Sequence, residues 1–355
     1  MKLGICGLPA AGKTTVFNAL TGAHRAVGLH EAESHLATVR VPDARLDVLA
    51  RMFQPSKITQ ATIDYVDIPG AQSDSPRDDL IRLLAALRDA DALLQVIRFF
   101  EHPAVPHPRG SLDPVRDDRE FHAELILADL DITEKRLQKI EKDMRHPRTD
   151  AAQLRAEYDL LRRCQQALER ERPVRALGLK SEELKALRGF QFLTAKPVLK
   201  VLNVGEGALH GPTTEAAAAA LGPGTIVMCA ELEMEIQDLD ESERPELLQG
   251  LGIGEPASAR VIRASYALLG LRSFFTYVSD ELRAWTIHEG DDALTAAGKI
   301  HSDIARGFIR AEVVHFDDLA AAGSLKEAKA RGKLRLEGKG YKVQDGDVIT
   351  FRFHV

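Results

Sequence analysis

The sequence predicts an α/β protein built on a doubly wound, mainly parallel sheet, with an inserted helical hairpin and a smaller C-terminal α+β domain. Strand-like apolar runs alternate with helical patterns near the start of the chain and again after residue 190. Between residues 121 and 168 the apolar spacing becomes three and four, which is typical of paired helices. From about residue 275, several short strands surround one helical segment.

Composition is that of an ordinary globular protein. The 355 residues are 45% hydrophobic and 28% charged, and the net charge of −6 argues against binding driven by overall basicity. No apolar run approaches the roughly 20 residues that cross a bilayer. The chain enters a strand at once, which leaves no room for a signal peptide. Its three cysteines, Cys6, Cys164 and Cys229, are far apart. We therefore expect a cytoplasmic protein with reduced, buried thiols and no membrane contact.

The first strand, around residues 3–6, leads into a glycine-bounded loop and then a helical pattern. Residues 7–15 read G-L-P-A-A-G-K-T-T, which fits G-x-x-x-x-G-K-[ST]. Gly7 and Gly12 permit backbone angles at which successive N–H groups point toward phosphate oxygens, and the helix N-terminus adds positive potential. Lys13 would reach the β- and γ-phosphates, and the Thr14 hydroxyl would ligate Mg²⁺. The stretch predicts a phosphate-binding P-loop.

The rest of the first third follows the same alternation. We expect a loop over residues 24–40, a helix over 42–52, a strand over 61–68, a helix over 78–89 and a strand over 92–100. The second strand ends in D-x-x-G, where Asp67 would hold Mg²⁺ through water and the Gly70 amide would sense the γ-phosphate. Four prolines between residues 101 and 118 predict an irregular loop.

Beyond that loop the pattern predicts three further parts. Residues 121–168 form an antiparallel coiled coil, interrupted near residues 146–148. Core strands at 197–204 and 225–230, with a covering helix at 216–221, return to the first domain. The last part has strands at 283–287, 309–315 and 341–355 and a helix at 293–307. The predicted domains are residues 1–120 with 190–274, residues 121–189, and residues 275–355.

With these parts in this order, the chain resembles the YchF branch of the Obg-like P-loop ATPases over nearly its whole length. The most specific segments are residues 125–131, 260–266, 283–287, 297–303 and 307–311. The last three resemble that family's TGS domain, a ubiquitin-like β-grasp module. The resemblance implies binding and hydrolysis of ATP with Mg²⁺, and association with a ribosome or RNA through the TGS and coiled-coil domains. We expect a monomer.

The choice of base rests on residues 203–206, Asn-Val-Gly-Glu. GTPases of this class read guanine with N-K-x-D, whose aspartate accepts from guanine. This chain has Val204 in place of the lysine and Glu206 in place of the aspartate, which removes a discriminator in favour of guanine. The N-x-x-E signature of the resembled family, matched by Asn203 and Glu206, is implied to accompany ATP preference. GTP remains the alternative.

Hydrolysis needs a group that orients water. Ras-like enzymes place a glutamine directly after D-x-x-G, but this chain has Ala71 there. The resembled family is implied to use a histidine on the loop after the next strand, and His107 matches that position. Histidine can hold or relay a proton near neutral pH. With neither a glutamine nor an arginine finger evident, we expect slow turnover.

Three departures separate the chain from the family pattern. Residues 26–38 lack the family's first-switch motif, although Ser34 or Thr38 could substitute for its Mg²⁺-binding threonine. The glycine-rich segment after D-x-x-G is replaced by residues 72–77, and Ala10 stands where the family has an asparagine linked in related enzymes to bound K⁺. The departures preserve phosphate binding and leave switching and hydrolysis open. A nucleotide-dependent binding module without hydrolysis is therefore a second hypothesis, and a GTPase a third.

The predicted site falls into three groups of residues. Catalysis is assigned to Lys13 and His107, and Mg²⁺ binding to Thr14 and Asp67. The nucleotide contacts are predicted at Gly7, Leu8, Pro9, Ala10, Ala11, Gly12, Lys13, Thr14, Thr15, Gly70, Asn203, Val204 and Glu206.

Overall fold

The computed structural model describes residues 1–23, 35–68, 76–145, 151–240 and 242–354. Contacts divide the chain into two compact units. The first comprises Met1–Ala37 and Asp64–Val261, and the second comprises Thr38–Ile63 and Ile262–Val355. The sequence assigned residues 38–63 to the nucleotide-binding domain, whereas their contacts group them with the C-terminal unit.

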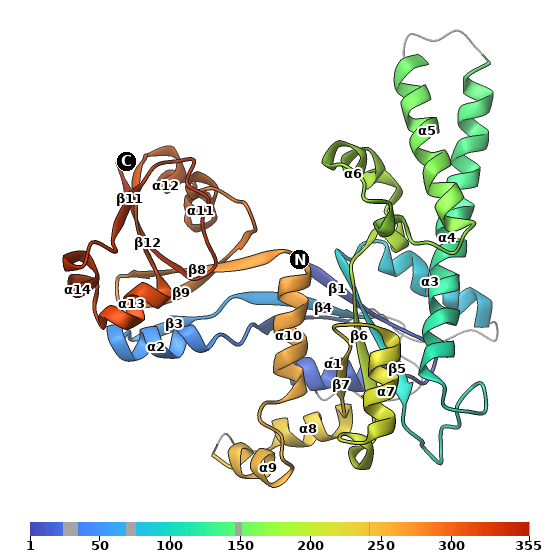
Figure 1. Ribbon diagram of the computed structural model, residues 1–355, viewed down its shortest axis with the longest axis horizontal. Coiled ribbons are helices and arrows are strands. Elements are labelled where there is room, and N and C mark those ends of the chain that lie inside the picture. The colour runs from blue at the N-terminus through green and yellow to red at the C-terminus, as the bar shows by residue number, and fades with distance from the viewer. Residues whose placement is uncertain (24–34, 69–75, 146–150, 241, 355) are drawn as a thin grey trace. The chain divides into compact units, whose positions relative to one another are not determined.

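The first unit is organised around a six-stranded sheet in the order β2-β4-β1-β5-β6-β7 (Figure 1), whose strands β2 and β4 extend partly into residues 38–63. Strands β4, β1, β5, β6 and β7 pair in parallel, which confirms the predicted mainly parallel sheet. Seven of the eight residues of β5 are buried, as expected for a central strand covered on both faces. The strands are β1 (Lys2–Cys6), β2 (His35–Arg40), β4 (Thr62–Asp67), β5 (Ala92–Phe99), β6 (Val198–Val204) and β7 (Ile226–Met228).

The expected loop over residues 24–40 is wrong for its last part. Residues 35–40 form β2 at the edge of the sheet, where partly buried and exposed residues alternate along the strand. Because neither face of this edge strand is fully buried, its sequence lacks a clear apolar period. Residues 24–34 lie outside the described part of the chain.

Helices and short 3₁₀ turns complete the first unit. Helix α3 packs with the start of α4 against β5 in one hydrophobic cluster that includes Leu84, Leu93 and Phe121. A second cluster joins β6 to α7 and α8 through Leu202, Leu221 and Leu232. These elements are α1 (Lys13–Thr21), α3 (Pro76–Leu87), η4 (Glu206–Ala208), α7 (Pro212–Leu221), α8 (Ala230–Asp238), α9 (Arg244–Gly250) and α10 (Ala257–Leu268), the last of which continues into the second unit.

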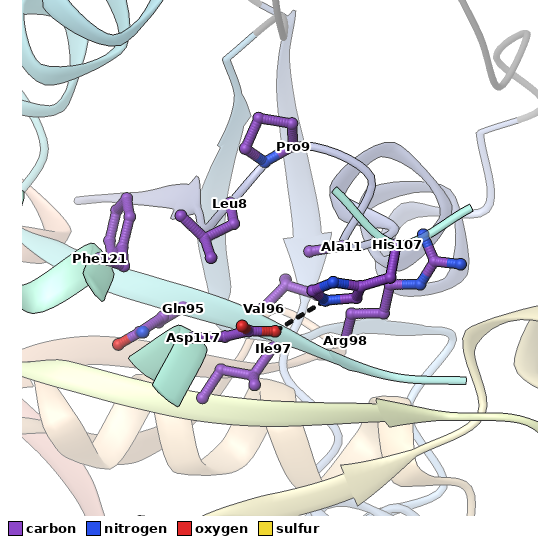
Figure 2. A pocket seen from close by; sticks show the side chains of 10 residues that line it. All are labelled: Leu8, Pro9, Ala11, Gln95, Val96, Ile97, Arg98, His107, Asp117 and Phe121. Atoms are coloured by element: carbon purple, nitrogen blue, oxygen red, sulfur yellow. Dashed lines mark hydrogen bonds and ion pairs between the residues drawn. The ribbon is translucent and has the colours of Figure 1, made fainter. Parts of the chain in front are cut away.

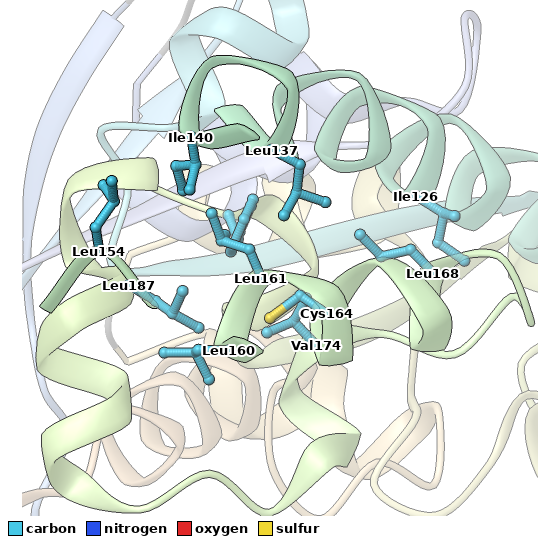
Figure 3. Close-up of a cluster of buried hydrophobic side chains, with 11 residues drawn as sticks. Ile126, Leu137, Ile140, Leu154, Leu160, Leu161, Cys164, Leu168, Val174 and Leu187 are labelled. Atoms are coloured by element: carbon cyan, nitrogen blue, oxygen red, sulfur yellow. The ribbon is translucent and has the colours of Figure 1, made fainter. Parts of the chain in front are cut away.

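The insertion is a helical hairpin of α4 (Pro114–Asp143) and α5 (Ala151–Leu168), which lie side by side (Figure 1). Its apolar stripe is buried between the helices and the following turns (Figure 3). Arg136 also donates two hydrogen bonds of 2.7 Å to Glu157 across the hairpin. Short elements then lead back to the sheet: η1 (Val174–Leu177), α6 (Ser181–Leu187), η2 (Arg188–Phe190) and η3 (Leu193–Ala195).

Helix α4 begins earlier than the prolines suggested. The expected loop through residue 118 is wrong from Pro114 onward, because that proline occupies the first helical turn, where a missing N–H leaves no hydrogen bond unmade. Asp113 caps the helix by accepting from the Arg116 N–H at 3.0 Å. The earlier start places Asp117 in the first helical turn, where it is buried, and the part-buried Asp118 directly after it.

The second unit is built on another six-stranded sheet, in the order β11-β10-β12-β8-β9-β3. Strand β3 comes from residues 38–63 and pairs with β9, with Lys57 opposite Glu281, which explains why this segment groups with the C-terminal unit. Its strands are β3 (Lys57–Thr59), β8 (Leu271–Val278), β9 (Glu281–His288), β10 (Phe308–His315), β11 (Arg335–Glu337) and β12 (Asp347–Phe353). Its remaining helices are α2 (Ala44–Phe53), α11 (Ala293–Ile300), α12 (Ser302–Arg306), α13 (Phe316–Ala322) and α14 (Leu325–Ala330).

Candidate nucleotide-binding site

The loop between β1 and α1 can be closed only by glycine at two positions. Gly7 has φ of 140°, and a Cβ there would lie 2.2 Å from the Val96 carbonyl oxygen. Gly12 has φ of 84°, and a Cβ there would lie 2.4 Å from Asn203 Nδ2. Both positions combine a left-handed backbone with a close approach to neighbouring strands, so the predicted pattern has a steric cause.

Ala10 lies at the turn of this loop with φ of 60°, an uncommon conformation for a residue with a Cβ. Its carbonyl oxygen accepts a 3.3 Å hydrogen bond from Arg98 Nη1. Asparagine, which the resembled family carries here, tolerates this region better than alanine. The loop therefore keeps its left-handed turn with a residue that strains it.

Lys13 opens α1, and its ammonium group lies against the loop. Nζ donates to the Gly7 and Leu8 carbonyl oxygens at 3.2 and 3.0 Å. Burial lowers the pKa of Lys13, and the negative charge of Asp67 opposes that shift. The neighbouring Cys6 thiol is fully buried, and its burial raises the thiol pKa to about 12, so a thiolate does not form near neutral pH.

The predicted Mg²⁺ ligands lie at the adjoining ends of β4 and α1. Asp67 is the last residue of β4 and pairs in register with Ile5 of β1, two residues before Gly7. Its side chain is 3% exposed. Thr14 is the second residue of α1 and is partly exposed. One hydroxyl and one carboxylate are hard oxygen donors, which suit Mg²⁺ when phosphate oxygens and water complete the coordination.

Some predicted residues cannot be placed. Gly70 and the two residues that follow it, as well as Ser34, lie outside the described part of the chain. Thr38 is described and lies in β2. In the described ranges no three His, Cys, Asp or Glu side chains gather as a metal cluster.

Asn203 joins two loops rather than facing outward. Nδ2 donates to the Ala11 carbonyl oxygen at 3.2 Å, and Oδ1 accepts from the Ala230 N–H at 3.2 Å. Asn203 is 4% exposed, and its two bonds tie the phosphate loop to the start of α8. Val204 is 2% exposed and belongs to the cluster with α7 and α8. Glu206 begins the 3₁₀ turn after β6 and is exposed. Of these three residues, it is therefore the one whose side chain is accessible to a ligand.

A cavity of about 290 Å³ lies beyond this turn. Its wall includes Leu209, Cys229 and Leu232 together with Glu233 and Arg260. Glu233 is not available as a ligand group, because its carboxylate accepts from the Ala257 and Ser258 N–H groups and so caps α10.

His107 lies beneath the phosphate loop. It lines a cavity of about 10 Å³, room for one water molecule, together with loop residues Leu8, Pro9 and Ala11 (Figure 2). Nε2 lies 2.9 Å from Asp117 Oδ2, and Nδ1 accepts from the Arg109 N–H at 3.1 Å. The structure therefore brings His107 close to the predicted loop.

Sequence reasoning missed two residues of this region, Arg98 and Asp117. Arg98 is 3% exposed, and it donates to the Phe100, Ala10 and Val105 carbonyl oxygens. Burial lowers its pKa, and the charge of Asp117 opposes that shift. The sequence feature that could have pointed to Arg98 is an arginine inside an otherwise apolar strand. No such feature marks Asp117, because its position depends on where α4 begins.

The segment at residues 125–131 has a structural role. Asp129 is fully buried and accepts from the Leu193 and Thr194 N–H groups at 3.0 and 2.7 Å. Arg88 Nη1 donates to the same carboxylate at 3.2 Å. The carboxylate thus anchors α4 to the chain that returns to β6.

The three cysteines are free and buried, as the sequence predicts. Among the described residues no helix is long and apolar enough to cross a bilayer.

Comparisons with known proteins match the whole length of the chain. A family model, MMR_HSR1, described as "50S ribosome-binding GTPase", matches residues 2–139. A second, YchF-GTPase_C, described as "Protein of unknown function (DUF933)", matches residues 271–354. The chain is 41% identical to the ribosome-binding ATPase YchF of Haemophilus influenzae, with 100% of this chain and 99% of that protein covered.

Two further relatives extend the likeness. The ribosome-binding ATPase YchF of Bacillus subtilis is 39% identical, with 100% of both chains covered. A solved structure of the Schizosaccharomyces pombe YchF GTPase has a TM-score of 0.86 and 28% identity, with 99% of this chain and 97% of that chain covered.

Proposed function

The chain belongs to the YchF family, and from this premise we propose that it is a P-loop ATPase that binds ATP with Mg²⁺ and hydrolyses it slowly to ADP and phosphate. The observation that carries the proposal is the loop of residues 7–12. Its two glycines adopt conformations that a Cβ would prevent, and Lys13 Nζ lies against its carbonyl oxygens.

The loop's backbone N–H groups and the N-terminus of α1 would bind the phosphate oxygens. Lys13 would exchange its two carbonyl partners for β- and γ-phosphate oxygens, a change favoured because the lysine is desolvated where it lies. Thr14 and Asp67 would hold Mg²⁺, which supplies charge neutralisation on the transferred phosphate. Gly70 would contribute its amide to the γ-phosphate.

We propose ATP rather than GTP as the nucleotide. The relatives' names differ on this point, since the bacterial proteins are called ATPases and the fission yeast protein a GTPase. Support comes from residues 203–206, where a glutamate replaces the aspartate that reads guanine. Because Val204 is buried and Asn203 ties two loops together, base selection would fall to Glu206 and nearby backbone groups.

His107 is the proposed group that orients water. It lies on the loop after β5 and lines the same cavity as three residues of the phosphate loop. A histidine acting alone, with no glutamine after D-x-x-G, would give slow basal turnover.

The proposed partner is a ribosome or RNA, which the bacterial relatives' names support, and contact would involve the hairpin and the C-terminal unit. Such a partner belongs to the cytoplasm, and we propose that the protein acts there as a monomer. A nucleotide-dependent binding module without hydrolysis is the second candidate. The absence of the family's first-switch motif in residues 26–38 favours it.

One set of measurements separates these functions. Titration calorimetry with ATP and GTP, with and without Mg²⁺, measures nucleotide choice, and phosphate release over many turnovers measures hydrolysis. We expect tighter binding of ATP, dependence on Mg²⁺, and a rate that falls in His107→Ala. Binding without release above background would replace the ATPase by the binding module. Tighter GTP binding would make the protein a GTPase.

A further inference from the structure

The His107 ring has both nitrogens engaged within the protein. Nδ1 accepts from the Arg109 backbone N–H at 3.1 Å, so in the neutral ring this nitrogen carries no hydrogen. Nε2 must then carry the hydrogen and donate it to Asp117 Oδ2 at 2.9 Å. The side chain is 8% exposed. In this orientation the ring has no nitrogen left with which to orient a water molecule.

We propose that Asp117 is a positioning residue that holds the His107 ring in this inactive orientation. Attack by water then requires the ring to break its hydrogen bond to Asp117. The inference rests on the proposed function, in which His107 orients the water. The basal rate of hydrolysis would then depend on the fraction of molecules in which His107 is not bonded to Asp117.

Asp117 is itself firmly held. Oδ1 accepts from Arg116 Nε and Nη2 at 3.0 and 2.8 Å, which leaves Oδ2 for His107. Its backbone N–H donates to the Asp113 carbonyl oxygen in the first turn of α4. A side chain that is 5% exposed, bonded to Arg116 through Oδ1 and attached to a helical backbone gives His107 a charge-assisted acceptor at a constant place.

Arg98 connects the loop that carries His107 to the loop between β1 and α1. Its guanidinium donates to the Ala10 carbonyl oxygen at 3.3 Å and to the Val105 carbonyl oxygen, two residues before His107, at 2.7 Å. The same side chain therefore contacts the loop that would bind phosphate and the loop that carries the histidine. A shift of Ala10 on nucleotide binding would be felt at Val105, and so at His107.

The next residue of α4 provides a matched control. Asp118 accepts from Gln95 Nε2 at 3.1 Å and from Lys200 Nζ at 2.8 Å. It carries the same charge on the same helical turn but makes no hydrogen bond to His107. Asp118→Ala therefore reproduces the loss of a part-buried carboxylate from α4 without releasing the ring.

The test measures the position of His107 and the rate separately in the full chain. Diethyl pyrocarbonate acylates accessible neutral imidazole nitrogens, and peptide mass spectrometry identifies His107 among the 12 histidines. In Asp117→Ala we expect faster acylation of His107 and a basal ATP hydrolysis raised roughly tenfold, the factor set by losing a hydrogen bond to a charged group. Asp118→Ala should change neither, and Asp117→Ala with His107→Ala should lose the increase in rate.

Asp117→Asn keeps the shape of the side chain and serves if the alanine variant does not fold. Its amide has one acceptor oxygen for two donors, Arg116 and His107 Nε2, so the ring is held only in molecules whose amide oxygen faces it. We therefore expect a smaller rise of about threefold. Unchanged acylation of His107 in a folded Asp117 variant overturns the proposal whatever the rate. A rate that falls at constant KM also overturns it, because Asp117 would then orient the ring for catalysis. A His107→Ala rate equal to wild type instead contradicts the proposed function.

Discussion

The substitution Asn203→Ala tests whether Asn203 clamps two segments of the protein together or recognises the nucleotide base. In the structure the side chain makes one bond to the Ala11 carbonyl oxygen and one to the Ala230 N–H, each 3.2 Å long. Ala11 and Ala230 are 2% and 1% exposed, so water cannot replace the lost amide. Each orphaned group costs about 1–3 kcal/mol, and the substitution should therefore lower the free energy of unfolding of the first unit by about 2–4 kcal/mol.

Hydrogen–deuterium exchange of β1 and β6 peptides across a urea series measures this loss in the first unit, even where the second unit unfolds separately. Calorimetry of the same variant should show ATP and GTP binding weakened by similar factors, because the phosphate loop itself loses its support. Glu206→Ala is the matched control from the same four-residue segment, and its exposed side chain predicts a stability change within about 0.5 kcal/mol. A selective loss of ATP affinity in Asn203→Ala at unchanged stability would refute the clamp.

Three other substitutions test the packing around the site and in the second unit. Ala10→Gly should raise the unfolding free energy by about 0.5–1 kcal/mol, measured by urea unfolding, since glycine relieves the strain of φ 60°. Arg98→Lys should lower it by about 2–4 kcal/mol, because an ammonium cannot reproduce three divergent bonds to carbonyl oxygens; a loss below 0.5 kcal/mol would contradict this. Burial raises the pKa of Asp347, so the folded state binds more protons and this group's contribution to stability falls as pH rises above about 3.9. Asp347→Asn removes that dependence, and thermal melts should show its stability improving relative to wild type between pH 4 and pH 7, whereas parallel curves would exclude the effect.

The phosphate loop and the helical hairpin were predictable because their signals are local. Gly7, Gly12 and Lys13 act within one turn of chain, and the apolar stripe of the hairpin repeats on the scale of a single helix. The boundaries were harder. The prolines predict a loop that includes Pro114, whereas this residue begins α4. Proline can end a helix or begin one, and only the capping bond at Asp113 distinguishes the two.

The glycine-bounded loop of residues 7–12, the mainly parallel sheet, the helical insertion and the C-terminal α+β part could all be predicted from the sequence, since each follows from contiguous residues. The contacts that support the predicted site became visible only in the folded chain. Asn203 bonds to residues 192 and 27 positions away, and His107 reaches Asp117 because α4 starts at Pro114. Strand β3 likewise joins β9 across more than 200 residues. Such pairings depend on which surfaces meet when the chain is compact, and a linear pattern of residues does not contain that information.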